Sequence, residues 1–308
     1  MLELADRWIW DSWYVRDGDT HHAFFLTARR DLPHPDDRHL NVSVGHATST
    51  DLRSWTVLPT ALSPSATPAF DDLATWTGSV LRHDDLWWMF YTGASRATKG
   101  LVQTVGIATS PDLTTWTRVP QSPVSQADPQ WYELLDREVW HDQAWRDPWV
   151  LHHDGEFHML VTARVPDGPT RQRGVIGHCT SPDLMTWTAG PPLTLPGAGF
   201  GQMEVPQVAV VDGVPVLLFC CGTEELDPAG PHERGGMFSV AGDGLLGPFD
   251  ASAARRFPHE SLYAARLVEH EGSWWLLGFR GTEDGRFVGA LTDPIQVTAR
   301  PGEGVVPR

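Results

Sequence analysis

Short apolar segments recur along the chain at a spacing of about sixty residues, and their length predicts β-strands rather than helices. Five of them follow a turn and begin at residues 21, 86, 156, 215 and 273, with the sequences HHAFFLTA, LWWMFYTG, EFHMLVTA, PVLLFCCG and SWWLLGFRG. The 29 Gly and 25 Pro are scattered between such segments, where they act as turn residues. The pattern therefore predicts an all-β protein built from repeated units.

A second motif follows three of these segments and predicts a hairpin. Its copies are GHATSTDLRSWT at residues 45–56, GIATSPDLTTWT at 106–117 and GHCTSPDLMTWT at 177–188, with degenerate partners at 239–250 and 288–297. Pro and Asp favour the turn, whereas Trp and Thr favour strands. Because one four-stranded unit cannot bury both of its faces, five units are expected to pack around an axis. We predict a single five-bladed β-propeller over residues 1–308, each blade a four-stranded antiparallel sheet, in preference to a β-sandwich.

The first strand of each unit precedes its apolar strand and is expected to line the central channel. These strands begin at Trp10, Trp76, Arg146, Met203 and Leu262, and in three of them the second residue is a carboxylate: Asp11, Asp147 and Glu204. The repeat places these three side chains at one mouth of the channel. Carboxylates gathered in a pocket raise at least one pKa, and glycoside hydrolysis requires a neutral acid beside an ionised partner. The alternative is a structural role, in which the carboxylates bond backbone amides.

Charge and composition narrow the classes of ligand. A formal net charge of −16 disfavours nucleic-acid and membrane-surface partners and favours a neutral substrate. The N-terminal residues have neither a basic start nor a long apolar stretch, so a cytoplasmic location is expected. The three cysteines show no metal-ligand spacing, and the adjacent pairs His21-His22 and His152-His153 point to opposite faces of a strand. We therefore expect no cofactor and no catalytic metal.

Four short motifs lie in order on the expected channel strands: WDSW at 10–13, WTGS at 76–79, RDP at 146–148 and MEVP at 203–206. Together they resemble the furanosidase propellers of glycoside hydrolase families 32 and 68, and the more distant family 43 shares the fold. The first motif is similar to the nucleophile motif of family 68, and the last resembles the Glu-Cys-Pro element of family 32. The resemblance covers nearly the full chain, but Ser12 departs from the family 32 opening motif, and no C-terminal β-sandwich is expected.

The resemblance implies roles for the three carboxylates. Asp11 would be the nucleophile, Glu204 the general acid and then the base, and Asp147 with Arg146 would hold two hydroxyls of the furanose. Seven side chains on the same strands are predicted to bind the sugar: Trp10, Trp13, Trp76, Ser79, Arg146, Gln207 and Tyr263. The aromatic loop at 125–145 is interpreted either as a wall for the second sugar or as packing.

The implied activity is that of a retaining β-fructofuranosidase acting on sucrose or short fructo-oligosaccharides, with fructosyl transfer left open. An inverting arabinofuranosidase or xylosidase of the family 43 type is an alternative, and the separation of the carboxyl groups distinguishes the two mechanisms. A non-catalytic sugar-binding propeller is the alternative from another class. In each case the partner is a small carbohydrate, and the oligomeric state is not predicted.

Overall fold

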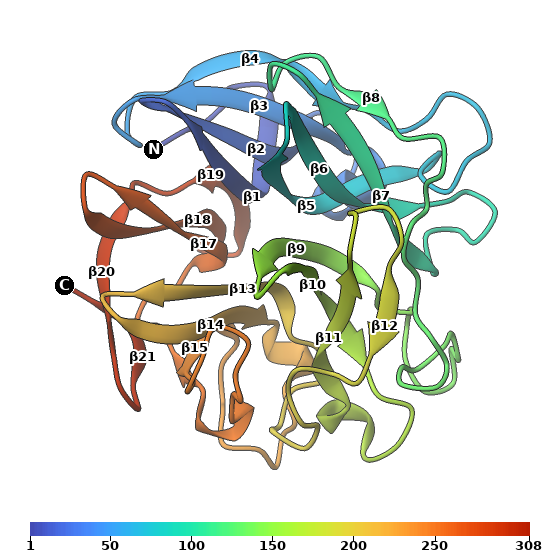
Figure 1. Cartoon of the computed structure of the whole chain (residues 1–308), viewed down its shortest axis with the longest axis vertical. Helices are drawn as coiled ribbons and strands as arrows, with labels where there is room; N and C mark the ends of the chain where they lie inside the picture. The colour runs from blue at the N-terminus through green and yellow to red at the C-terminus, as the bar shows by residue number, and fades with distance from the viewer.

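Five antiparallel sheets follow one another around a central axis in the computed structural model, which describes all residues from 1 to 308 (Figure 1). Within each sheet the strands lie in chain order from the centre outward. The innermost strands contact one another around the ring. The predicted five-bladed β-propeller is therefore confirmed, and the predicted channel strands are innermost.

The first three blades have four strands each. Blade 1 consists of β1 (Arg7–Asp17), β2 (Thr20–Arg29), β3 (Ser43–Ser49) and β4 (Thr56–Leu62). Blade 2 consists of β5 (Ala74–His83), β6 (Leu86–Ala94), β7 (Gln103–Ser110) and β8 (Thr117–Arg118). Blade 3 consists of β9 (Arg146–His153), β10 (Glu156–Arg164), β11 (Gly174–Ser181) and β12 (Thr188–Gly190).

The last two blades complete the ring. Blade 4 consists of β13 (Glu204–Val211), β14 (Val214–Cys221), β15 (Gly236–Ala241) and β16 (Arg255–Arg256). Blade 5 consists of β17 (Leu262–His270), β18 (Ser273–Glu283), β19 (Arg286–Leu291), β20 (Ile295–Arg300) and β21 (Gly304–Pro307). The helices are short 3-10 turns: η1 (Pro35–Leu40), η2 (Thr170–Gln172), η3 (Thr223–Glu225) and η4 (Ala251–Ala253). None of them has the length and apolar character needed to cross a membrane.

The repeated motif forms the turn between the third and fourth strands of blades 1 to 3. In each copy the Asp carboxylate accepts hydrogen bonds from the backbone amides two and three residues later, as at Asp112 with Thr114 and Thr115. The following Leu adopts a left-handed φ of 60° to 66° and is buried in all three copies: Leu52, Leu113 and Leu184. The Asp thus supplies the bonds that hold a strained Leu as the anchor of the turn.

Blade 5 departs from the predicted pattern at residues 288–297, which were expected to form a degenerate hairpin. Instead β19 and β20 both pair with β18, so together they occupy the third strand position, and β21 is the fourth. Leu2 forms an isolated bridge with Leu291, whose amide donates to the Leu2 carbonyl at 2.9 Å. This bridge joins the N-terminal segment to the last blade beside β1.

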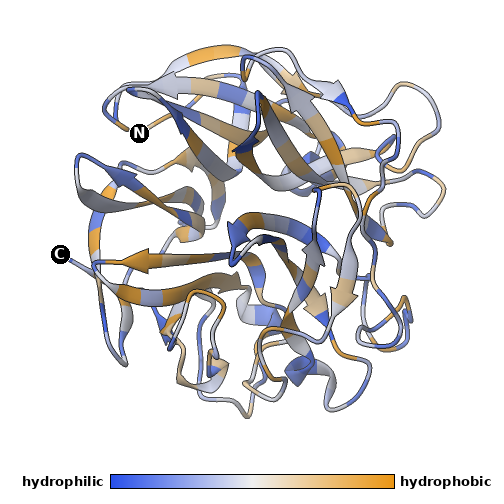
Figure 2. Ribbon diagram, viewed as in Figure 1, coloured by the Kyte–Doolittle hydropathy of each residue, from blue (hydrophilic) through white to orange (hydrophobic).

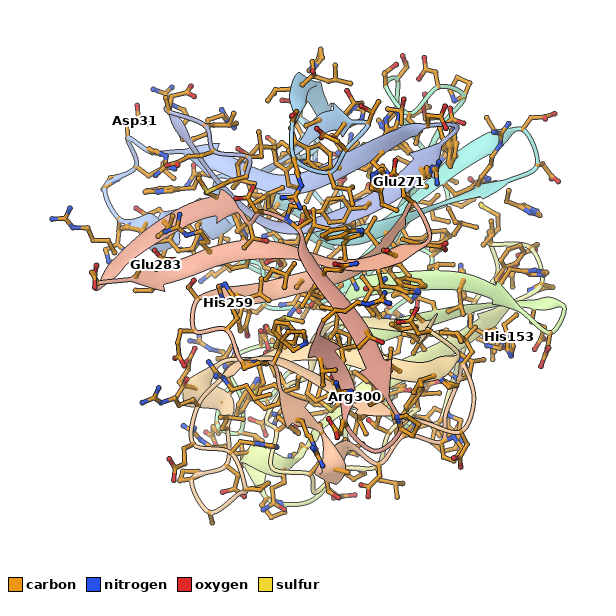
Figure 3. The ribbon with its side chains drawn as sticks, turned by 90° about the vertical axis from the view of Figure 1, so that its left-hand side faces the viewer. Asp31, His153, His259, Glu271, Glu283 and Arg300 are labelled. Atoms are coloured by element: carbon orange, nitrogen blue, oxygen red, sulfur yellow. The ribbon has the colours of Figure 1, made fainter.

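Apolar residues, coloured orange, recur along the strands of the blades (Figure 2). A core cluster of 43 buried residues runs through blades 1, 2, 4 and 5, and two smaller clusters fill blades 3 and 4 and their borders. Figure 3 separates the two faces of the ring: Glu271 and His153 mark one face, whereas Asp31, His259 and Glu283 mark the other. The connection from β2 to β3, which contains Asp31 and η1, lies on the second face.

Candidate active site

Every inner strand carries a β-bulge near the cavity that the sequence predicted. The register shifts between Trp10 and Ser12 in β1 and between Trp76 and Gly78 in β5, and equivalent shifts interrupt β9 after Arg146, β13 after Glu204 and β17 after Tyr263. A bulge leaves one residue unpaired and redirects its side chain. Asp11 and Asp147 have left-handed φ angles of 25° and 58°, a conformation that Asp tolerates better than most residues. The bulges therefore turn Asp11 and Asp147 out of the regular ladder, whereas Glu204 pairs with Cys220 just before the bulge of its strand.

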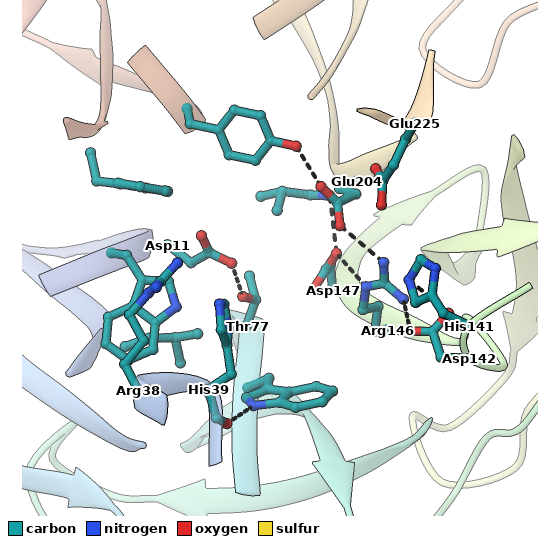
Figure 4. Close-up of a pocket in the computed structure, with 16 residues that line it drawn as sticks. Asp11, Arg38, His39, Thr77, His141, Asp142, Arg146, Asp147, Glu204 and Glu225 are labelled. Atoms are coloured by element: carbon teal, nitrogen blue, oxygen red, sulfur yellow. Dashed lines mark hydrogen bonds and ion pairs between the residues drawn. The ribbon is translucent and has the colours of Figure 1, made fainter. Parts of the chain in front are cut away.

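The three predicted carboxylates line one cavity of about 460 Å³ (Figure 4). Asp11 lies on one side, facing Asp147, Arg146 and Glu204 (Figure 4). The residues that line the cavity are Trp10, Asp11, Leu26, Arg38, His39, Trp76, Thr77, His141, Asp142, Arg146, Asp147, Glu204, Val205, Glu225, Tyr263 and Phe279. The repeat predicted that these three carboxylates converge although they lie far apart along the chain, and they line the same cavity.

Asp11 is held by one side-chain contact. The Thr77 hydroxyl, on the neighbouring blade, donates to Oδ2 of Asp11 at 2.5 Å. Burial raises the pKa of Asp11 to about 7, and the negative charge of Asp147 and that of Glu204 add to the rise, while the Thr77 hydrogen bond opposes it. Asp11 is thus one of the carboxyl groups of the cavity whose pKa is raised, as expected for such a cluster.

Glu204 has two hydrogen-bond donors, one on each carboxylate oxygen. Nη2 of Arg146 donates to Oε1 at 2.9 Å, and the Tyr263 hydroxyl donates to Oε2 at 2.5 Å. The two donors come from blades 3 and 5, on either side of blade 4. Glu204 is therefore fixed in orientation while its carboxylate faces the cavity.

Asp147 is more enclosed than the other two carboxylates, with 4% of its surface exposed. The Thr162 hydroxyl and the Val205 amide donate to Oδ2 at 2.8 and 3.2 Å, and Nε of Arg146 lies 3.8 Å from the same oxygen. Burial raises the pKa of Asp147, and the charge of Arg146 is the largest effect opposing that rise. The enclosed position of Asp147 suits a fixed anion that binds hydroxyl groups. It is less suited to a group that must move during the reaction.

Arg146 is the centre of a polar network that extends beyond the cavity wall. Nη1 donates to Gln103 Oε1 at 3.0 Å and to Asp142 Oδ2 at 3.1 Å, and Nη2 also contacts Gln202. Gln103 in turn donates to Asp142 at 2.8 Å. The guanidinium therefore has partners on most of its donor groups and holds Asp142, Asp147 and Glu204 in a fixed arrangement.

The profile of the glycosyl hydrolases family 32 N-terminal domain matches residues 13–248, which is more than half of the chain. The chain belongs to glycosyl hydrolase family 32. Among curated relatives, an extracellular sucrase of Zymomonas mobilis is 25% identical over 292 residues, which cover 80% of this chain and 69% of that protein. A sucrose-6-phosphate hydrolase of Pediococcus pentosaceus is 29% identical over 176 residues, which cover 57% of this chain and 32% of that protein. The chain thus aligns with only about a third of the length of this second family 32 relative.

Solved structures share the fold of this family 32 chain. An inulosucrase from Halalkalicoccus jeotgali bound to kestose superposes with a TM-score of 0.80 at 20% identity, covering 99% of this chain and 91% of that one. A family 32 β-fructofuranosidase from Bombyx mori gives a TM-score of 0.75 at 18% identity, covering 97% of this chain and 62% of that one. At these identities the likeness concerns the propeller fold.

Four of the seven predicted sugar-binding residues line the cavity of this family 32 protein: Trp10, Trp76, Arg146 and Tyr263. Trp13, Ser79 and Gln207 do not line it, and nothing in the structure supports the predicted sugar contact of these three. Trp13 is fully buried in the core, 0% exposed. Ser79 accepts from the Val150 amide at 3.1 Å, and Gln207 bonds both main-chain groups of Leu267. The last two side chains therefore link adjacent inner strands instead of facing the cavity.

Several cavity residues were missed because they lie on irregular connections. Arg38 and His39 belong to η1, and Glu225 ends η3, so no strand register could place them. Burial raises the pKa of Glu225 to about 8, with the charge of Glu204 as the next cause. Its Oε2 is buried without a hydrogen-bond partner. Glu225 is therefore a carboxyl group of the cavity that favours its neutral form.

In the loop at 125–145, aromatic side chains pack against the protein and two other residues line the cavity. His141 and Asp142 line the cavity. Tyr132 and Trp145 are buried against each other, with ring centroids 4.7 Å apart. Trp140 lies under the guanidinium of Arg164, 3.8 Å from the ring centroid. The aromatic residues thus anchor the loop, and its polar residues reach the site.

Proposed function

We propose that this family 32 protein is a retaining β-fructofuranosidase that acts on sucrose or short fructo-oligosaccharides. The observation that carries the proposal is the placement in one cavity of two carboxyl groups with different partners, Asp11 and Glu204. Hydrolysis of a glycosidic bond requires two such groups with different tasks. The names of the relatives, a sucrase from Zymomonas mobilis and a fructan 6-exohydrolase from Beta vulgaris, support this class of substrate.

In the first step Glu204 transfers a proton to the glycosidic oxygen while the Asp11 carboxylate attacks the anomeric carbon. The bond to the leaving sugar breaks, and a covalent fructosyl ester forms on Asp11. The Tyr263 hydroxyl can donate or accept a hydrogen bond, so its contact with Glu204 persists in both protonation states. Asp147 and Arg146 bind hydroxyl groups of the furanose and stabilise the positive charge of the transition state.

In the second step a water molecule attacks the same carbon. Glu204, now ionised, takes a proton from the water, and Asp11 leaves as a carboxylate. The anomeric configuration is retained because two inversions take place. Both steps use the same proton site on Glu204, and this explains why its orientation is fixed from two sides.

The charges of the cavity favour a sugar without a phosphate group. Five carboxyl groups line it, and two of them are neutral at the start of the proposed reaction: Glu225, whose pKa is about 8, and Glu204, which carries the transferred proton. Asp11, Asp142 and Asp147 remain against two guanidinium groups, Arg38 and Arg146. A phosphate group carries one to two negative charges at neutral pH and would be repelled by this excess. We therefore propose plain sucrose and short fructans as substrates in preference to sucrose 6-phosphate.

The test is a panel of sucrose, sucrose 6-phosphate, inulin-type oligomers, levan and aryl arabinofuranosides, with the products separated by chromatography and the first product anomer identified by NMR. We expect release of fructose from sucrose or oligomers with retained configuration. Longer fructosyl products would indicate transfer to a sugar. Turnover only of the arabinofuranosides with inversion would replace the proposal by a family 43 type of mechanism, and binding without turnover by a non-catalytic role.

A further inference from the structure

Arg266 is a buried cation that lies beneath the cavity and takes no part in lining it. It follows the bulge in β17, and 1% of its surface is exposed. A buried charge is costly unless its donors are bonded and an opposite charge lies near. The buried guanidinium of Arg266 is therefore expected to have a specific role at the centre of the ring.

Its hydrogen bonds go to main-chain carbonyls of two other blades. Nη1 donates to the Val205 carbonyl at 3.2 Å and to the Pro206 carbonyl, and Nη2 reaches the Gly78 carbonyl at 3.5 Å. The guanidinium carbon lies 5.1 Å from the ring centroid of Trp149 in blade 3. The side chain therefore joins blades 2, 3 and 4 to blade 5 under the site.

The same carbonyls belong to the segments that hold the catalytic carboxylates. The amide of Val205 donates to Asp147, and Gly78 follows Thr77, whose hydroxyl donates to Asp11. These carbonyls satisfy hydrogen bonds but carry no negative charge. Burial lowers the pKa of Arg266 to about 10, whereas Asp147, Cys220 and Asp11 act to raise it. The guanidinium therefore stays charged at neutral pH. The carboxylates whose charges offset the burial of Arg266 are thus Asp147 and Asp11.

We propose that Arg266 is a positioning residue of the active site, which fixes the bulges of β5 and β13 beneath the cavity and supplies the positive charge that favours ionised Asp11. The inference rests on the proposed function, because it assigns Asp11 the attack on the anomeric carbon. Removal of the guanidinium would leave Asp11 and Asp147 facing each other with Arg146 and Arg38 as the remaining cations near them.

The groups that face Asp11 from each surrounding element are few. They are Thr77 on β5, Asp147 on β9, Glu204 on β13, Cys220 on β14, Arg266 on β17 and Arg38 in η1. The pKa of Cys220 is raised by burial, so this thiol stays neutral. Arg266 is the one cation among them that also bonds the strands carrying the donors to Asp11 and Asp147. Its effect on the ionisation of Asp11 can therefore be separated from that of the cavity residues.

The experiment compares the pH dependence of kcat/KM on sucrose for the native protein, Arg266→Lys, Arg266→Gln and Arg266→Met. We expect the acid limb to move upward by up to about one pH unit in the Gln and Met variants, because an opposite charge near a carboxylate lowers its pKa. The Lys variant should keep the limb near its native position. Unchanged limbs in the neutral variants, or a Lys variant shifted as far as they are, would overturn the proposal. If the neutral variants do not fold, the Lys variant keeps the proposal falsifiable, because a shifted limb in a variant that retains the positive charge would overturn it.

A control and a second readout separate this proposal from the proposed function. Arg164 is another arginine with 1% exposure, but it bonds Glu133 and the carbonyls of Gly201 and Thr170 outside the inner ring. Arg164→Met should lower stability without moving the acid limb. Titration of the Asp11 carboxyl by carbon NMR needs no turnover: a raised midpoint in Arg266→Gln supports the inference even if no sugar is hydrolysed. An unchanged midpoint refutes it whatever the activity.

Discussion

The Thr77 hydroxyl donates a hydrogen bond of 2.5 Å to Asp11 across the border between blades 2 and 1. Both residues lie in bulges of adjacent inner strands, so the contact depends on two equivalent irregularities that meet at one level of the ring. The bond favours the ionised form of Asp11, which burial and Asp147 disfavour. It is the one side-chain contact that holds the proposed nucleophile.

Thr77→Val should therefore move the acid limb of kcat/KM upward and lower kcat by about tenfold to a hundredfold, since a hydrogen bond to a charged group contributes about 1.5–3 kcal/mol. The pKa of Asp11 is about 7 with the bond present, so the native limb is expected near neutral pH. Thr77→Ser keeps the hydroxyl and is the matched control, with a limb at the native position. A Val variant that titrates like the Ser variant would show that the contact does not tune Asp11.

Asp11→Asn should stabilise the folded protein at alkaline pH and not at acid pH. The folded protein binds the Asp11 proton more tightly than the unfolded chain, because the pKa is raised from 3.8 to about 7. The contribution of the Asp11 proton to the free energy of unfolding is therefore lost as pH rises from about 4 to about 7. The Asn side chain does not ionise, so the variant does not show this loss. Since the side chain partly contacts the cavity, we expect a gain of about 1–3 kcal/mol at pH 8.

Chemical denaturation of both proteins at pH 4 and pH 8 measures this gain. Asp17→Asn is the control, because Asp17 lies in an exposed turn at the end of β1. Equal midpoints for native protein and Asp11→Asn at pH 8 would mean that Asp11 ionises in the fold without cost.

Glu225 provides a prediction about substrate binding. It lies on the far side of Glu204 from Asp11 in the view of Figure 4, which is the side of the leaving sugar in the proposed mechanism. Its carboxyl is expected to be neutral at pH 6.5, since its pKa is about 8. Glu225→Gln should keep KM for sucrose within about threefold, whereas Glu225→Ala should raise it about tenfold.

The neighbouring Glu224, which is exposed, is the matched control for Glu225. Steady-state kinetics at pH 6.5 and pH 9 provide the measurement. At pH 9 the native protein should lose affinity relative to Glu225→Gln, because ionised Glu225 loses its proton as a hydrogen-bond donor. If Glu225→Ala binds sucrose as tightly as Glu224→Ala, the leaving sugar does not contact this carboxyl.

The positions of the three carboxylates could be predicted because the repeat aligns the inner strands, and a ring places aligned positions at one level. The same register predicted that Ser79 and Gln207 face the cavity, and the structure does not place them there. The bulges shift the alternation of side chains and turn these two toward the next inner strand. Glu225 and Arg38 lie on connections whose path is set by packing between blades, and no periodic pattern in the sequence records that path. The fold, the three carboxylates and the cavity residues Trp10, Trp76, Arg146 and Tyr263 therefore followed from periodicity, whereas the cavity residues on the connections did not.

Azide rescue of Glu204→Ala tests the central claim most directly, since it requires both a covalent intermediate on Asp11 and a base at Glu204. An aryl β-fructofuranoside with a good leaving group needs no acid, so the variant should form the intermediate and release it slowly. Added azide needs no base, so it should accelerate turnover and yield fructosyl azide with retained configuration, whereas Asp11→Ala should show neither effect. Native-like turnover of Glu204→Ala without azide, or an inverted product anomer, would contradict the account.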